Sequence, residues 1–147
     1  MAKQTTIRQS GALVYHFGPR GLHFGLITSR GRGRWVIPKG HVDKGLSATA
    51  SAAKEVFEEM GVKGDLMDRA IGRYCYTKYD EPKNRIYEVI VYPMLALDIL
   101  EDWPEMDSRQ RDWVSPFEAV QRVEETDLKH MITEFAADLA AIRFAAE

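Results

Sequence analysis

The first part of the chain carries the hydrophobic pattern of β-strands. Apolar and β-branched residues are enriched over 7–17 and 22–29, and the Gly-Pro-Arg-Gly segment between them is typical of a turn. A loop over 30–34 leads to a short strand that begins at Trp35 and stops at Pro38. The pattern therefore predicts a β-hairpin followed by a third, shorter strand.

The second half contains further strands and then helices. Strand-like runs near 68–78 and 86–98 are separated by a polar turn, and a short strand is expected near 110–114. Pro116 suits the first turn of a helix that we expect to continue through Val123. A last helix is predicted from about Thr126 to near the end, because its apolar residues repeat with helical spacing: Leu128, Met131, Ile132, Phe135, Leu139 and Ile142.

A helix between these two halves concentrates carboxylates on one side. Ser47 is a suitable N-cap, and Gly61 stands where a left-handed C-terminal cap is expected. Helical spacing gathers Glu55, Glu58 and Glu59 opposite an apolar stripe of Ala53, Val56, Phe57 and Met60. Like charges one turn apart, near the negative end of the helix dipole, are unfavourable unless a cation compensates them. Grouped carboxylate oxygens suit Mg²⁺ or Mn²⁺, although a solvated acidic helix face has the same pattern.

The spacing around this helix resembles the Nudix box, written G-x5-E-x7-R-E-U-x-E-E-x-G-U with U a bulky aliphatic residue. The matching positions are Gly40, Glu55, Val56, Glu58, Glu59, Gly61 and Val62. Two positions depart from it: Leu46 stands at the first Glu and Lys54 at the Arg. Lys54 keeps a positive charge four residues before Glu58, whereas Leu46 removes a carboxylate.

The resemblance implies an α+β fold, an α/β/α sandwich with a mixed β-sheet between helices, and a metal-dependent hydrolase of diphosphates. It implies metal binding by the Gly40 carbonyl, Glu55, Glu58 and Glu59, with Glu58, Glu59 and Lys39 as catalytic candidates. Glu58 is the preferred candidate for deprotonating or orienting water, but ligand and base are not distinguished because such groups titrate together. Mg²⁺ or Mn²⁺ is the expected cofactor.

A second resemblance narrows the expected substrate class. The segments 34–35, 38–40, 100–103, 109–113 and 118–120 are similar to diphosphoinositol polyphosphate phosphohydrolases. This similarity implies cleavage of a phosphoanhydride bond in an inositol- or nucleoside-linked polyphosphate, of the diphosphoinositol or dinucleoside polyphosphate type.

A basic loop immediately before the acidic helix agrees with such a substrate. Arg30, Arg32, Arg34 and Lys39 lie within ten positions, and the interspersed glycines allow close approach of the backbone to a ligand. Arginine binds phosphate bidentately and lysine binds it as a point charge. The sequence therefore predicts a phosphate-binding loop, with a solvated surface loop and an arginine-glycine RNA-binding tract as alternatives.

Composition sets the remaining expectations. The 147 residues predict a single domain over 1–147, and the net charge of −2 gives no reason to expect nucleic-acid or membrane binding. Cys75 is the one cysteine and no apolar run approaches a membrane span, so we expect a cytoplasmic protein. The family resemblance implies a small-molecule polyphosphate substrate. A second copy of the chain is a candidate partner. Two other functions stay open: a non-catalytic nucleotide-sensing module, favoured by Leu46, and an RNA 5′-end pyrophosphohydrolase.

Overall fold

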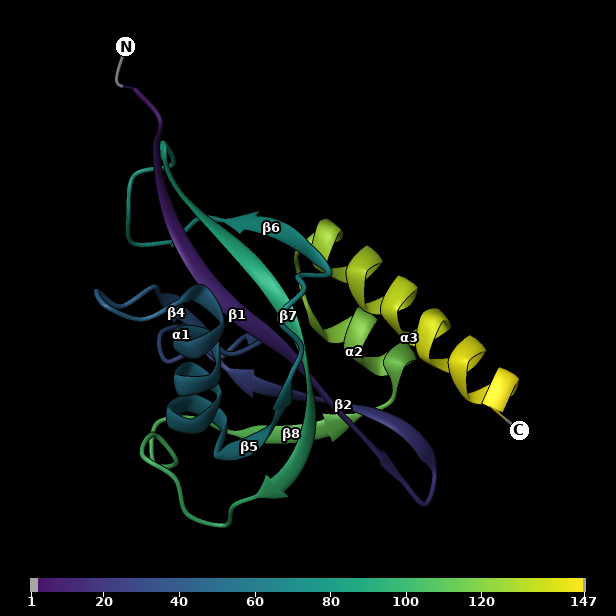
Figure 1. Cartoon of the computed structure of the whole chain (residues 1–147). Helices are drawn as coiled ribbons and strands as arrows, with labels where there is room; N and C mark the ends of the chain where they lie inside the picture. Colours follow the sequence, from purple (N-terminus) through teal and green to yellow (C-terminus); the bar gives the residue numbers. More distant parts are fainter. Residues whose placement is uncertain (1–2, 147) are drawn as a thin grey trace.

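Two long parallel strands form the centre of the computed structural model, which describes residues 3–146 (Figure 1). β1 (Thr5–Gly18) pairs with β7 (Arg85–Ile99) from Thr5 opposite Arg85 to Tyr15 opposite Leu95. The other strands of the eight-stranded sheet pair antiparallel, so the sheet is mixed. These strands are β2 (Gly21–Thr28), β3 (Trp35–Val36), β4 (Lys39–His41), β5 (Val62–Leu66), β6 (Gly72–Tyr76) and β8 (Arg111–Val114).

Helices cover both faces of this sheet. α1 (Ala48–Glu55) continues into the π-helical segment η1 (Val56–Met60) on one face, and α2 (Pro116–Arg122) and α3 (Thr126–Ala146) lie on the other (Figure 1). This arrangement confirms the predicted α/β/α sandwich. In the part of the chain that is described, no helix is long and apolar enough to cross a membrane.

The core has two halves because side chains alternate along β1. Leu13 packs with Leu128 and Ile132 of α3, whereas Val14 faces the opposite way and packs with Val56 of η1. All five residues have an exposed fraction of 0%. Each helix layer is thus fixed to the same central strand from its own side.

Both ends of the acidic helix are formed by the predicted capping residues. The Ser47 hydroxyl accepts a hydrogen bond from the Ala50 N–H at 3.1 Å. Gly61 adopts the left-handed conformation with φ 71°, and its N–H donates to the carbonyls of Val56 and Phe57 at 3.1 Å. The bond to Val56 spans five residues, so the last turn of the helix is wider than an α-helical turn.

The structure corrects the sequence-based elements at two places. The chain forms β5 directly after Gly61, and the strand expected over 68–78 is confined to β6. β5 contains Lys63 and Asp65, which are exposed, so it lacks the apolar run that signals a buried strand. Ile142 continues the apolar stripe that predicted α3 but is 65% exposed. Figure 1 shows why: the C-terminal end of α3 extends beyond the sheet.

Two isoleucines on α3, one buried and one exposed, test how much core packing contributes to stability. We expect Ile132→Ala to lower the free energy of unfolding by about 2–5 kcal/mol, because it leaves a cavity in the fully buried core. Ile142→Ala should change it by less than about 0.5 kcal/mol, since that side chain is mostly exposed. Urea unfolding of both variants measures the difference, and equal losses would contradict the packing described for α3.

Candidate active site

An open cleft of about 500 Å³ lies where β4, the ends of β1 and β6, and the acidic helix meet. It brings together most of the residues that the sequence predicted for the site. Its lining includes the acidic Asp43, Glu55 and Glu59, the cationic Arg30, Arg32, Arg34, Lys39, Lys78 and Arg109, and Gly40, Gln9, Tyr76 and Tyr79. Of the predicted site residues, only Glu58 lies outside this lining.

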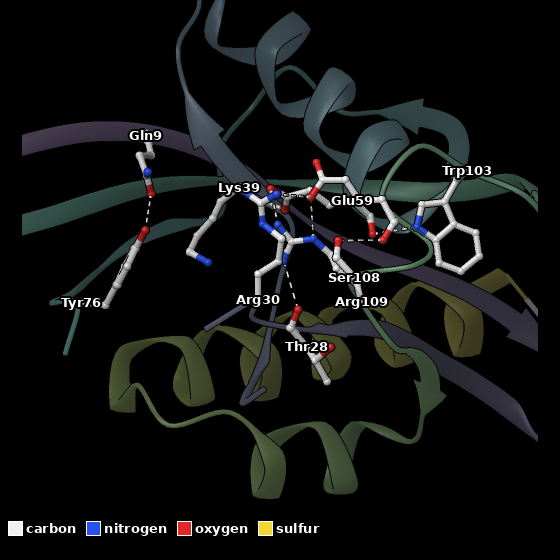
Figure 2. Close-up of polar contacts among 10 residues, drawn as sticks. Gln9, Thr28, Arg30, Lys39, Glu59, Tyr76, Trp103, Ser108 and Arg109 are labelled. Carbon is white, nitrogen blue, oxygen red and sulfur yellow. Dashed lines mark hydrogen bonds and ion pairs between the residues drawn. The ribbon is translucent and has the colours of Figure 1, made fainter. Parts of the chain in front are cut away.

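Glu59 is the buried carboxylate of the cleft, with an exposed fraction of 7%. Its Oε1 accepts a hydrogen bond from the backbone N–H of Lys39 at 3.1 Å, and its Oε2 lies 3.2 Å from the Arg109 guanidinium (Figure 2). Burial raises the pKa of Glu59, and the positive charges of Arg109 and Lys39 oppose that rise. Both carboxylate oxygens are therefore held in place by donors from β4 and from the segment before β8.

Arg109 is itself fixed on three sides. Besides Glu59, its Nε donates to Glu105 Oε1 at 2.9 Å and its NH1 to the carbonyl of Thr28 at 3.0 Å (Figure 2). The second resemblance included Arg109, but no role followed from its place in the sequence. Only the fold shows that Arg109 is the partner of Glu59.

The loop before β8 also closes the C-terminal end of the acidic helix. Three successive carbonyl groups of η1 each receive one donor from this loop or from the start of β8: Glu58 from the Glu105 N–H at 3.0 Å, Glu59 from the Trp103 indole N–H at 3.0 Å, and Met60 from the Arg111 guanidinium at 2.8 Å. The Arg111 guanidinium also lies 4.1 Å from the centre of the Trp103 ring. Helix ends leave such carbonyls unpaired unless other groups satisfy them. Trp103 thus has a defined role: its indole N–H satisfies a carbonyl group of η1 and its ring contacts Arg111.

Gly40 and Glu55 are in direct contact across the cleft. A Cβ atom at Gly40 would overlap the Glu55 carboxylate and lie 2.5 Å from its Oε1, so a side chain at residue 40 would displace that carboxylate. Burial and then the charge of Glu59 raise the pKa of Glu55 to about 8. Two close carboxylates supply the oxygen ligands that Mg²⁺ or Mn²⁺ prefers, so the chemistry of this pair suits a divalent cation.

Glu58 lies apart from that group. Among residues 3–146, no three acidic, histidine or cysteine side chains are arranged to hold a metal ion. The Glu58 side chain is 35% exposed and lies 3.9 Å from Lys54, which is closer to Asp43 at 2.7 Å. Lys54 was expected to hold Glu58, and in the structure its main partner is Asp43. The predicted role of Glu58 as a ligand or base stays a prediction.

Lys39 lines the cleft and lies against an aromatic ring. Its ammonium group lies 4.9 Å from the centre of the Tyr76 ring, and burial lowers the pKa of Lys39 to about 8, a fall that the Glu59 charge opposes. The Tyr76 hydroxyl donates to Gln9 Oε1 at 2.7 Å, which fixes the ring against β1 (Figure 2). Neither Tyr76 nor Gln9 was predicted with this role.

The three arginines of the basic loop differ in their surroundings. Arg30 is 64% exposed and lies 3.9 Å from Glu105. Arg32 and Arg34 form ion pairs with Glu124 at 3.1 Å and Glu125 at 2.8 Å, respectively. These two acids precede α3 and are far away in the sequence, so the loop carries less free positive charge than its composition suggested.

A comparison with known protein families shows which family has this sequence pattern. The sequence model of the NUDIX domain matches residues 8–135. The chain belongs to the NUDIX family. The predicted family and fold are therefore confirmed.

Curated relatives of this NUDIX chain have names from the expected enzyme class. The human diphosphoinositol polyphosphate phosphohydrolase 3-alpha is 34% identical over 96 residues, covering 64% of this chain and 55% of the relative. The chloroplastic Nudix hydrolase 21 of Arabidopsis thaliana is 28% identical over 129 residues, covering 85% of this chain and 64% of the relative. The chain thus spans little more than half the length of the first of these relatives.

A solved structure supports the fold. The binary complex of Caenorhabditis elegans Ap4A hydrolase superposes with a TM-score of 0.73, at 19% identity, over 92% of this chain and 98% of that one.

Replacing Arg109 tests how much its charge stabilises the buried Glu59 carboxylate. We expect Arg109→Met to lower the free energy of unfolding at neutral pH by about 3–5 kcal/mol, because it leaves a buried carboxylate without its charged partner. Arg73→Met, which breaks the pair with Glu88 at an arginine that is 62% exposed, should cost less than about 1 kcal/mol. Chemical unfolding of both variants measures these free energies. Similar losses would show that the Glu59–Arg109 pair does not stabilise the fold more than an exposed ion pair does.

Proposed function

We propose that this NUDIX chain is a metal-dependent hydrolase that cleaves a phosphoanhydride bond in a nucleoside- or inositol-linked polyphosphate. One observation carries the proposal: a single cleft holds Glu55 against Gly40, the buried Glu59, and several cationic side chains. Hydrolysis of a diphosphate requires both oxygen ligands for a metal ion and groups that bind phosphate in one site.

The proposed metal ligands are the Gly40 carbonyl, Glu55 and Glu59, with Glu58 as a further ligand or as the group that orients water. A bound Mg²⁺ or Mn²⁺ supplies polarisation of a phosphoryl oxygen and activation of water. The chain holds Glu59 in place through Arg109 and the Lys39 N–H, so its carboxylate needs little reorganisation when substrate binds. We assign to Lys39 the stabilisation of negative charge that develops on the phosphate, because its ammonium group lines the same cleft.

The cationic residues of the cleft support a substrate with several phosphates. Arg30, Arg32, Arg34, Lys39 and Lys78 all line the cleft. Guanidinium groups are suited to bidentate contacts with phosphate. The human relative is named for diphosphoinositol polyphosphate and the Caenorhabditis elegans structure for Ap4A, which agree with this class.

Two features favour this function over the alternatives. Leu46, which stands where the box has its first Glu, is 41% exposed and does not line the cleft, so its apolar side chain leaves the proposed metal site intact. Arg32 and Arg34 are paired with acids rather than free along a basic tract, which is less suited to the strongly salt-dependent binding of RNA.

Hydrolysis of a substrate panel tests the proposed chemistry. We expect release of phosphate or nucleotide from a diadenosine polyphosphate or a diphosphoinositol polyphosphate with Mg²⁺, and none with chelator. Glu55→Gln and Glu59→Gln should each lower kcat about a thousandfold, because each removes a charged oxygen ligand while keeping the shape of the side chain. Glu101→Gln, an exposed site outside the cleft, is the control. Turnover that persists in chelator or in both cleft variants would reject the mechanism.

The length of the phosphate chain tests the role of the basic loop. We expect Arg32→Ala to raise KM about tenfold for a substrate with four or more phosphates and little for one with two, since a charge-assisted contact to phosphate contributes about 1.5–3 kcal/mol. Arg20→Ala, which removes an exposed arginine from the turn between β1 and β2, should leave both KM values unchanged. Equal effects on the long and short substrates would remove the argument for polyphosphate selectivity.

A further inference from the structure

A carboxylate of the chain lies between two arginines of the cleft. Glu124 Oε1 accepts a hydrogen bond from Arg32 NH2 at 3.1 Å, and its Oε2 lies 3.5 Å from the same nitrogen. Oε2 also lies 3.8 Å from Arg34 NH1, too far for a hydrogen bond. Glu124 therefore holds the position that an oxyanion shared by the two guanidinium groups would take.

Arg34 is fixed from its other side and keeps an unused donor. Its NH2 lies 2.8 Å from Glu125 Oε2, and the two side chains are only 17% and 11% exposed. Arg34 NH1 is buried and has no hydrogen-bond partner among the described residues. A buried donor without a partner is costly, so an anion that reached NH1 with better geometry than Glu124 would be favoured.

The two acids differ in how easily they can be displaced. Arg32 and Glu124 are 48% and 54% exposed, and an ion pair of this kind contributes at most about 1 kcal/mol. The pair between Arg34 and Glu125 is largely buried, so breaking it would leave uncompensated charge inside the protein. An incoming anion can therefore replace Glu124 while Glu125 continues to hold Arg34.

Space for such an anion is present beside the main cleft. A hollow of about 230 Å³ is lined by Arg32, Arg34, Glu124 and Glu125 together with Lys83 and Tyr79. Arg32, Arg34 and Tyr79 also line the main cleft, so the two spaces are adjacent. A chain of phosphates bound at the proposed metal site can extend into this hollow.

We propose that Glu124 is a specificity-determining residue: its carboxylate occupies an anion subsite formed by Arg32 and Arg34, and a phosphoryl group of the substrate must displace it to bind there. The identity of the ligand as a substrate phosphate rests on the proposed function. A long, highly charged phosphate chain can replace Glu124 and gain the free donor of Arg34. A short chain does not reach the subsite and leaves Glu124 in place.

The test uses inorganic tripolyphosphate as a binding probe, measured by calorimetry on the full chain. We expect Glu124→Gln to lower the Kd about fivefold, because the glutamine no longer competes as an anion for Arg32 and Arg34. Glu134→Gln, an exposed site on α3 outside both hollows, removes the same charge and should leave the Kd unchanged. Orthophosphate should gain much less than tripolyphosphate. Thermal unfolding should give the same midpoint temperature for both variants, because both changes are at exposed sites.

The inference would be overturned if Glu124→Gln bound tripolyphosphate no more tightly than Glu134→Gln, or more weakly. It would also be overturned if Glu124→Gln gained as much affinity for orthophosphate, which would assign the subsite to free phosphate. Turnover provides a second readout, in which Glu124→Gln lowers KM for substrates with four or more phosphates, with kcat and the KM of a two-phosphate substrate unchanged. The binding measurement needs no hydrolysis. Tighter tripolyphosphate binding without turnover of any panel substrate would reject the proposed function and leave the anion subsite established.

Discussion

The cleft depends on the buried ion pair between Glu59 and Arg109. Through these two side chains the end of the acidic helix is joined to β4, to β2 and to the loop before β8, because Lys39, Thr28 and Glu105 complete their hydrogen bonds. Neither charge would be tolerated at this depth without the other. The pair therefore sets the distance between the helix that carries the carboxylates and the strand that carries Gly40 and Lys39.

The helix end is built to carry acidic residues where acidic residues are unfavourable. Negative side chains near a helix C-terminus are repelled by the unpaired carbonyl groups there. In this chain those carbonyls bind the N–H of Glu105, the indole of Trp103 and the guanidinium of Arg111, which brings a positive charge. The π-helical turn, a distortion often found at functional sites, carries both Glu59, which lines the cleft, and Glu58, which does not. These contacts therefore offset the repulsion between the glutamates and the negative end of the helix dipole.

Local features of the fold could be predicted from the sequence, and long-range pairings could not. The caps at Ser47 and Gly61 and the strands β1, β2 and β7 follow from residue types and short periodicities. Periodicity does not reveal where a neighbouring layer ends, so Ile142 continues the apolar stripe of α3 after the sheet has stopped. β5 was missed because an edge strand with polar residues has little apolar signal.

The same limit applies to the cleft. The box located Gly40, Glu55 and Glu59, whose spacing is set within one strand, loop and helix. The ion-pair partners of Glu59, Arg32 and Arg34 lie in residues 105–125. Nothing in the sequence indicates which of these distant residues pairs with which. The charge of the basic loop could be read from its composition, but its neutralisation by Glu124 and Glu125 depends on where α3 begins.

The parallel pairing of β1 with β7 also has a consequence for the order of folding. The acidic helix, β5 and β6 all lie between these two strands in the chain, so the sheet closes only after a long loop has been brought together. Such non-local pairing slows folding, because the entropy of closing the loop is lost before the contacts form. During synthesis β1 and β2 can form a hairpin early, but β1 can pair with β7, and Glu59 with Arg109, only after the later segments have been made. The cleft is therefore completed late in synthesis, although Gly40, Glu55 and Glu59 belong to the first half of the chain.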